Sequence, residues 1–353
     1  MMKLPQWTSG KSFEAKPNRL ARRFDDGWRT WLAENLAQGA QPDSLLGILT
    51  AQGFGAADVR EEIAQARASP YFRVAEKLAK RLAKRDWVLD TRCKLARARP
   101  DWQRVERRHR LSRVEFLDSY YANNRPVVIT GMMDDWPAMK KWNLDYFEKN
   151  FGDRVVEVMT GRNSDDNYEI GRDKHLTKMK FSEFIEMVRK AGVTNDFYMM
   201  ANNHSVNRGA LDALWSDIGQ LPEYLKADTP MGYFWIGPAG TITPFHHDLT
   251  NNFMAMVTGR KRVKLVPSWD TPFMQNHMSY FSKLDGRPLT PTPNPAFGER
   301  QVVECVLGPG EILFLPIGWW HFVEGLDMAF MVSFTNFCID NDFTTFFNTY
   351  HEV

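Results

Sequence analysis

The segment Thr243-Pro244-Phe245-His246-His247-Asp248 places two potential metal ligands where a predicted strand ends. Side chains at positions i and i+2 of a strand point to the same face. His246 and Asp248 can therefore reach a common ion, while His247 points away from it. A His-x-Asp triplet arises often by chance, so a metal site also needs a second imidazole from a distant part of the sequence.

That imidazole follows 75 residues later, at His321. Gly308-Pro309-Gly310 predicts a tight turn into a buried strand, and Trp319-Trp320-His321 comes after it. Strands far apart in sequence lie side by side in a jelly roll. Two imidazoles and one carboxylate leave coordination positions open, as in non-haem Fe(II) oxygenases. Hydrolytic zinc sites use the same ligands. The alternative without a metal makes His321 a core histidine between tryptophans and His246 a surface residue.

The second half of the sequence alternates short strands with Gly- and Pro-containing turns, which predicts a sandwich or jelly-roll barrel. We expect a mainly β domain with helices, a double-stranded β-helix, over residues 112–353. The expected strands from Met231 onward are Tyr233–Ile236, Asn252–Val257, Arg262–Val266, Val302–Val306, Ile312–Leu315 and Ala329–Phe334.

Residues 19–111 predict an N-terminal helical bundle that is basic toward its end, preceded by a tail over residues 1–18. Four short amphipathic helices are expected, with Asp43 and Asp58 capping the second and third. The segment from Tyr71 to Arg113 has 15 Lys or Arg against 5 Asp or Glu. Such a segment can attract an acidic peptide or, as the lesser expectation, nucleic acid. The alternative is a solvated helical face.

Composition predicts a cytoplasmic protein. No window reaches the ~18 apolar residues of a membrane span, and the N-terminus lacks the apolar core of a signal peptide. The three cysteines are odd in number and widely spaced, which fits a reducing compartment. If a homodimer forms, we expect the helical bundle or the segment Phe343–Tyr350 to supply the contact.

The stretch from Gly232 to Asn336 resembles the JmjC oxygenases. Within that family it resembles the cupin-like hydroxylases typified by the asparaginyl hydroxylase that inhibits hypoxia-inducible factor. The motifs that carry this resemblance are Gly237–Asp248, Asn252-Phe253, Gly259–Arg262, Gly308–Gly310 and Trp319–His321.

The resemblance assigns His246, Asp248 and His321 as the iron ligands and as the catalytic centre. It places Lys261 where an ammonium pairs with the distal carboxylate of the co-substrate 2-oxoglutarate. The other residues that it assigns to the co-substrate site are Thr243, Asn252, Asn336 and Tyr198.

Alternatives remain for these co-substrate residues. Lys261 is one of three consecutive basic residues and can simply be solvated, and Lys264 is a second candidate. Strand parity decides between the two, because it fixes which face a side chain takes. The other assigned residues can be ordinary polar residues that satisfy backbone groups.

The resemblance implies an Fe(II)- and 2-oxoglutarate-dependent dioxygenase that uses O2 to hydroxylate a C–H bond in a side chain of a peptide or protein. The Asp ligand favours the hydroxylase branch over the histone demethylases, which more often use Glu. The alternatives are a 2-oxoglutarate-dependent hydroxylase of a small metabolite and a non-enzymatic metal-binding cupin. A wide groove with charged walls would favour a polypeptide substrate, and a closed apolar pocket would favour a metabolite.

Overall fold

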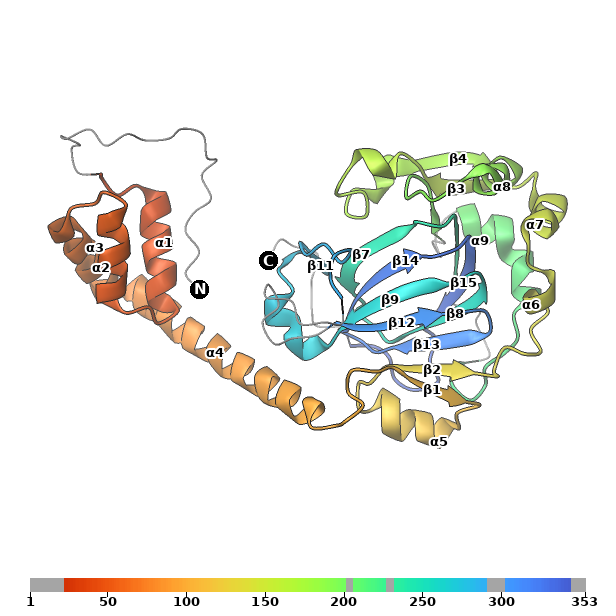
Figure 1. Ribbon diagram of the computed structural model, residues 1–353, viewed down its shortest axis with the longest axis horizontal. Helices are drawn as coiled ribbons and strands as arrows, with labels where there is room; N and C mark the ends of the chain where they lie inside the picture. The colour runs from red at the N-terminus through yellow and green to blue at the C-terminus, as the bar shows by residue number, and fades with distance from the viewer. Residues whose placement is uncertain (1–21, 201–205, 227–231, 291–301, 344–353) are drawn as a thin grey trace. The chain divides into compact units, whose positions relative to one another are not determined.

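The computed structural model describes residues 22–200, 206–226, 232–290 and 302–343, and it divides into two compact units, Met1–Arg92 and Cys93–Val353 (Figure 1). The division falls inside a helix, upstream of the boundary expected near residue 111. The predicted tail over residues 1–18 lies outside the described residues, as does nearly all of the segment Phe343–Tyr350. None of the described helices combines the length and apolarity that crossing a bilayer requires.

The first unit contains helices α1 (Asp26–Ala37), α2 (Pro42–Ala51), α3 (Ala56–Ala68) and most of α4 (Pro70–Arg97). The predicted caps of α2 and α3 are wrong. Gln41 and Gly55 occupy the N-cap positions, so Asp43 and Asp58 lie inside the first turns. Pro42 stands at the start of α2, where its missing N–H costs nothing. The core of the unit consists of Trp28, Trp31, Leu32, Leu36, Leu45, Leu49, Phe54, Val59 and Ile63.

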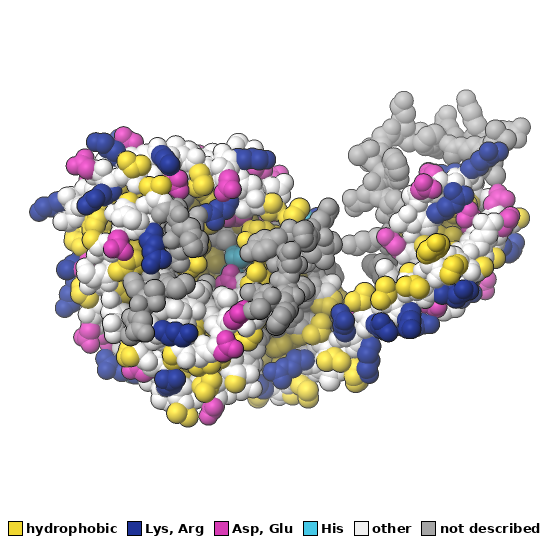
Figure 2. Space-filling model, turned by 180° about the vertical axis from the view of Figure 1, so that it is seen from behind, with side chains coloured by type: hydrophobic (Ala, Val, Ile, Leu, Met, Phe, Trp, Pro, Cys, Tyr) yellow, Lys and Arg dark blue, Asp and Glu magenta, His cyan; other side chains and the backbone are white. Residues whose placement is uncertain are grey.

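Helix α4 is a single 28-residue helix rather than a short one, and Cys93 is its buried residue. An apolar stripe on it, formed by Tyr71, Val74, Leu78 and Leu82, is exposed. Figure 2 shows hydrophobic side chains along the helix, with Lys and Arg side chains beside them. The basic segment therefore lies largely on an exposed helix, and its binding of an acidic peptide or of nucleic acid stays a prediction.

The second unit is a jelly roll of two facing sheets, as predicted. The larger sheet has the order β1-β2-β13-β8-β15-β6-β5, and the smaller has the order β10-β11-β7-β14-β9-β12. The strands of the larger sheet are β1 (Glu106–His109), β2 (Val127–Thr130), β5 (Met199–Met200), β6 (Gly232–Gly237), β8 (Asn252–Thr258), β13 (Glu311–Leu315) and β15 (Ala329–Phe334). Those of the smaller sheet are β7 (Ile242–His247), β9 (Lys261–Val266), β10 (Asn276–Met278), β11 (Phe281–Ser282), β12 (Val303–Leu307) and β14 (Trp320–Gly325).

Alternation along the strands separates two cores. Met254 and Met256 on β8 face Val263 and Leu265 on β9 between the sheets. The alternate residues of β8, Phe253, Ala255 and Val257, point to the outer face of the larger sheet, where helices cover them. The α-helices and the ribbon around the barrel are α5 (Arg113–Phe116), α6 (Ala138–Lys141), α7 (Leu144–Phe151), α8 (Phe181–Lys190), α9 (Val206–Leu211) and the pair of β3 (Val155–Met159) and β4 (Leu176–Lys180). Short 3-10 and π-helical turns connect several of these elements.

Candidate metal centre

Pairing of β7 with β14 brings the two predicted histidines together. His246 lies directly opposite His321, and the centroids of their rings are 4.0 Å apart. Asp248 follows the end of β7, with its Oδ1 3.9 Å from Nε2 of His246. One ligand atom from each of the three residues lies within 4.8 Å of the others. Figure 2 shows a histidine in a hollow of the surface with an acidic side chain beside it.

The hydrogen bonds of the two imidazoles leave the same nitrogen of each available. Nδ1 of His246 is 2.8 Å from the carbonyl of Pro244, and Nδ1 of His321 is 3.0 Å from the carbonyl of Trp319. Such bonds fix the tautomer and direct Nε2 toward a metal. Burial lowers the pKa of His246 to about 4 and also lowers the pKa of His321. Neutral imidazoles with one carboxylate are a donor set that fits Fe(II).

Asp248 is held on both sides by neighbouring groups. Nδ2 of Asn252 donates to Asp248 Oδ2 at 3.1 Å, and the amide of Gly318 donates to the Asp248 carbonyl at 3.2 Å. The Oδ1 atom of Asn252 is buried, and no hydrogen-bond partner for it lies among the described residues. Asn252, predicted in the co-substrate site, thus directly orients a metal ligand.

Replacing Asn252 with alanine is expected to weaken divalent-metal affinity. Losing a hydrogen bond to a metal ligand typically reduces affinity by about 10- to 100-fold. Titration with Co(II), followed by its visible absorption, measures the change. Asn143→Ala is the control, because Asn143 caps α7 by accepting from the amide of Tyr146 at 2.9 Å and should affect thermal stability alone. Equal Co(II) affinity of Asn252→Ala and the wild type would contradict this role.

Lys261 lies on the same face of the smaller sheet as His321. On the paired strands, Gly325, Val323 and His321 stand opposite Lys261, Val263 and Leu265. Side chains two residues apart share a face, so the ammonium of Lys261 points between the sheets.

The Lys261 ammonium is buried and donates to the hydroxyl of Tyr198 at 2.6 Å. No carboxylate of the described residues forms an ion pair with it. Burial, aided by the positive charge of Arg162, lowers the pKa of Lys261 to about 7. A buried cation of this kind suits an anionic ligand, because the charge is otherwise uncompensated.

Lys264, the alternative candidate, belongs to the opposite face. Its ammonium donates to the carbonyls of Gly286 and Arg287 at 2.8 and 3.0 Å. It lies beside the ring of Phe322, which belongs to the core on the outer face of the smaller sheet. Lys264 therefore supports a loop, while Lys261 faces the space between the sheets.

Two further predicted residues differ in where they lie. Thr243 stands opposite Val323, and a bulge in β7 keeps it on the face of His246, since three steps along β7 match two along β14. Asn336 instead donates to the carbonyl of Lys226 at 3.0 Å and lines a separate cavity of about 190 Å³. These contacts do not test its predicted place beside the co-substrate, which stays a prediction.

Sequence reasoning missed a buried charged pair next to β7. Arg162 Nη2 donates to Glu169 Oε1 at 2.9 Å and to the carbonyl of Ile242 at 2.7 Å. Both side chains are buried, and burial raises the pKa of Glu169. The two residues come from irregular segments without periodicity, and their partner on β7 is far along the sequence. We find no sequence signal that would have identified them.

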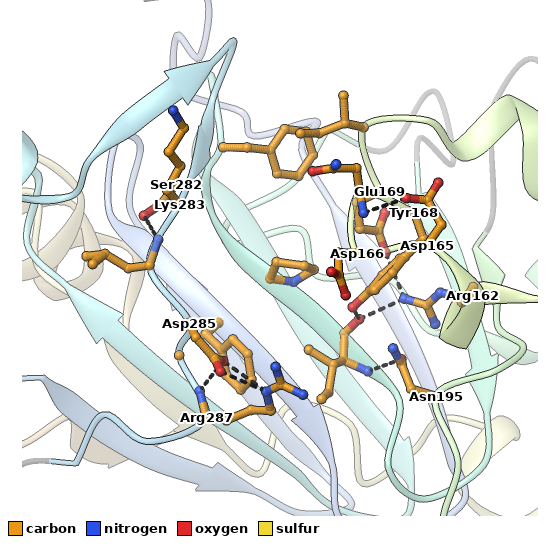
Figure 3. A pocket seen from close by; sticks show the side chains of 18 of the residues that line it. Arg162, Asp165, Asp166, Tyr168, Glu169, Asn195, Ser282, Lys283, Asp285 and Arg287 are labelled. Atoms are coloured by element: carbon orange, nitrogen blue, oxygen red, sulfur yellow. Dashed lines mark hydrogen bonds and ion pairs between the residues drawn. The ribbon is translucent and has the colours of Figure 1, made fainter. Parts of the chain in front are cut away.

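A cavity of about 540 Å³ borders β7 on this side. Pro244 and Phe281 line it, and the ring of Phe281 lies 5.8 Å from the ring of His246. Figure 3 shows its charged walls. Four carboxylates and three basic side chains line it, namely Asp165, Asp166, Glu169, Asp285, Arg162, Lys283 and Arg287.

Comparison with known proteins identifies related sequences. Residues 113–352 match the family described as "Cupin-like domain". The protein is 36% identical over 243 residues to "Lysine-specific demethylase JMJ30" of Arabidopsis thaliana, covering 66% of this chain and 54% of that protein. It is 30% identical over 245 residues to "Lysine-specific demethylase 8" of Xenopus tropicalis, covering 65% and 52%. It is 26% identical over 272 residues to "Arginine-specific demethylase JMJ22" of Arabidopsis thaliana, covering 68% and 48%. The matched region spans about half the length of these relatives.

Proposed function

The chain belongs to the cupin-like domain family, and from that premise we propose that it is an Fe(II)- and 2-oxoglutarate-dependent dioxygenase acting on a side chain of a peptide or protein. The observation that carries the proposal is the convergence of His246, Asp248 and His321, with the buried cation of Lys261 on the same face. The JmjC relatives support the general class of enzyme. The finer likeness to the asparaginyl hydroxylase stays a prediction.

In such an enzyme, separate residues would bind the metal and the co-substrate. His246, Asp248 and His321 would hold Fe(II). Bound iron, with 2-oxoglutarate and O2, supplies the chemistry that converts a C–H bond to C–OH and releases succinate and CO2. Lys261 and the hydroxyl of Tyr198 would bind the distal carboxylate of 2-oxoglutarate. A dianion buried in an apolar barrel needs such a fixed cation, because an unpaired buried charge is costly.

The space between the sheets limits access of water to this centre. Met254, Met256, Val263, Leu265 and Val323 are buried there. A dry site strengthens the electrostatic contacts of the bound co-substrate and prevents side reactions. The protein thus contributes positioning and exclusion of water rather than the redox chemistry itself.

The cavity beside β7 favours a polypeptide substrate over a small apolar metabolite. Its walls carry seven charged side chains in addition to amides and hydroxyls. A charged groove suits the polar surface of a peptide, whereas sites for small apolar ligands are lined mainly by hydrophobic side chains. The relatives' names, lysine- and arginine-specific demethylases, also point to protein side chains.

Demethylation is the second candidate, favoured by those names. Hydroxylation of an N-methyl group yields an unstable product that loses formaldehyde, so one centre serves both outcomes. We place side-chain hydroxylation first because of the Asp ligand and the resemblance of the motifs. A non-enzymatic cupin would not need the complete set of His246, Asp248, His321 and Lys261.

Mass spectrometry of peptides distinguishes these outcomes. Purified protein is incubated with Fe(II), 2-oxoglutarate, O2 and matched peptide sets carrying unmodified or N-methylated Lys and Arg. Gain of one oxygen atom on an unmodified peptide, with succinate formed in equal amount, supports hydroxylation. Loss of a methylene unit with formaldehyde supports demethylation instead. Succinate coupled to oxidation of a small metabolite, with every peptide unchanged, would overturn the proposed substrate class.

A further inference from the structure

Side chains from outside the two sheets hold the backbone of Ile242, the first residue of β7. Strands β6 and β7 are consecutive in sequence but belong to different sheets. The amide of Ile242 donates to Oδ1 of Asn195 at 2.7 Å. Its carbonyl accepts from the hydroxyl of Tyr168 at 2.9 Å and from Nη2 of Arg162 at 2.7 Å. These contacts fix the backbone immediately before Thr243, and Figure 3 shows them converging on one residue of β7.

The guanidinium of Arg162 is enclosed between two aromatic rings. Its central carbon lies 4.3 Å from the ring centroid of Tyr168 and 5.2 Å from that of Tyr198. The side chain is fully buried, and Glu169 is its ion-pair partner. Nε and Nη1 have no hydrogen-bond partner among the residues described. Burial of such a cation is costly, and contacts with the ring faces and one carboxylate offset part of the cost.

Tyr198 connects Arg162 to the predicted co-substrate site. Its ring lies against Arg162, while its hydroxyl accepts from the ammonium of Lys261. Arg162 therefore contacts the ring that positions the Lys261 ammonium, and it also holds the carbonyl that precedes Thr243. Two groups assigned to the same carboxylate of 2-oxoglutarate depend on one planar side chain.

We propose that Arg162 is a positioning residue for 2-oxoglutarate, holding Tyr198 and the start of β7 so that Lys261 and Thr243 meet the distal carboxylate together. This inference rests on the proposed function. Arg162 is suited to the task because its Nη2 donates to two acceptors while the planar face of its guanidinium lies against two aromatic rings. A lysine at the same place keeps the charge and loses this geometry.

A second consequence follows from the charge of Arg162. Among the described residues, the titratable groups that face Lys261 are Tyr198 and Arg162, and Glu169 interacts with both of these. Arg162 adds to burial in lowering the pKa of Lys261 to about 7. Binding of an anion needs the protonated ammonium, so affinity for 2-oxoglutarate should fall as pH rises through this pKa. Neutralising Arg162 should raise the pKa of Lys261 and move the fall to higher pH.

The test measures binding of 2-oxoglutarate to Co(II)-loaded protein by calorimetry, from mildly acidic to alkaline pH. Arg162→Met should weaken binding at least about tenfold at the acidic end, the scale of one hydrogen bond to a charged group. Its affinity should also fall at higher pH than that of the wild type. Arg162→Lys should weaken binding and keep the wild-type pH profile. A residue that merely stabilised the fold would not separate the two variants in this way.

Controls keep the outcomes distinct. Arg189→Met removes a surface arginine of α8 and should leave binding unchanged. Because Arg162→Met leaves the Glu169 carboxylate buried without its partner, the variant Arg162→Met with Glu169→Gln removes both charges. If neither charge-removing variant folds, the affinity of Arg162→Lys decides. Folded variants that bind 2-oxoglutarate with wild-type affinity and pH profile would overturn the inference alone. A wild type that binds Co(II) but not 2-oxoglutarate would overturn the proposed function.

Discussion

Asp248→Ala is expected to lose divalent-metal binding and, with it, all formation of succinate. The variant keeps His246 and His321 within reach of a metal but removes the negatively charged ligand of the group. Attraction between a carboxylate and a cation near a protein surface is worth roughly 4 kcal/mol at 4 Å, or about a thousandfold in dissociation constant. For a divalent ion in direct contact with the carboxylate, removing Asp248 should cost at least this much binding free energy.

Co(II) titration and a succinate assay with Fe(II) together measure this loss. Asp327→Ala is the matched control, because Asp327 pairs with Arg260 on the surface and is not part of the group. Thermal melting of the metal-free proteins checks that both variants fold. Wild-type Co(II) affinity in Asp248→Ala would show that the metal is held elsewhere. A wild type that binds Zn(II) but gives no 2-oxoglutarate turnover with Fe(II) would favour the hydrolytic alternative.

The barrel and its metal group were predictable because both depend on local rules. Short strand-forming runs between Gly- and Pro-containing turns mark the strands from Tyr233 to Phe334, and the structure confirms each of the expected strands. His246 and Asp248 share a face because side chains two residues apart on a strand point the same way. The position of Lys261 between the sheets also follows from parity, since the register of β9 against β14 places it with His321.

What escaped prediction depends on contacts between distant irregular segments. Arg162 and Asn195 meet Ile242 across long stretches of sequence, and no periodic pattern reports such a contact. The length of helix α4 was also missed, although the sequence accounts for it. No Gly or Pro interrupts the sequence between Pro70 and Arg97, so the helix continues. Asn336 was assigned by resemblance; its side chain donates to the carbonyl of Lys226, and its role at the co-substrate site stays a prediction.

Lys261→Met is expected to weaken 2-oxoglutarate binding by roughly two to three orders of magnitude, the cost of truncating one partner of a buried hydrogen-bonded charge pair. Methionine fills similar space without a charge, so the barrel should still fold. The same variant should be more stable than the ligand-free wild type at neutral pH, because a buried ammonium without a carboxylate partner costs free energy. Calorimetry with Co(II)-loaded protein and thermal melting without ligand measure the two effects.

The difference in stability between Lys261→Met and the wild type is expected to depend on pH. Burial lowers the pKa of Lys261 from 10.5 to about 7 in the folded protein. Between these values the unfolded protein binds a proton that the folded protein lacks, so this residue makes the wild type more stable as pH rises through the window. Lys261→Met lacks that rise, and its stability advantage should therefore shrink toward alkaline pH. An advantage that grew with pH would contradict a buried ammonium at this position.

Lys264→Met is the matched control from the same strand. It is expected to lower stability and to leave the affinity for 2-oxoglutarate unchanged. Removing this ammonium leaves the carbonyls of Gly286 and Arg287 without their donor, at a cost of about 1–3 kcal/mol. Affinity for 2-oxoglutarate should stay at the wild-type value, because the side chain points away from the space between the sheets. If Lys264→Met lost the co-substrate and Lys261→Met retained it, the two lysines would have exchanged faces. That result would place β9 one residue out of the register in which Leu265 opposes His321.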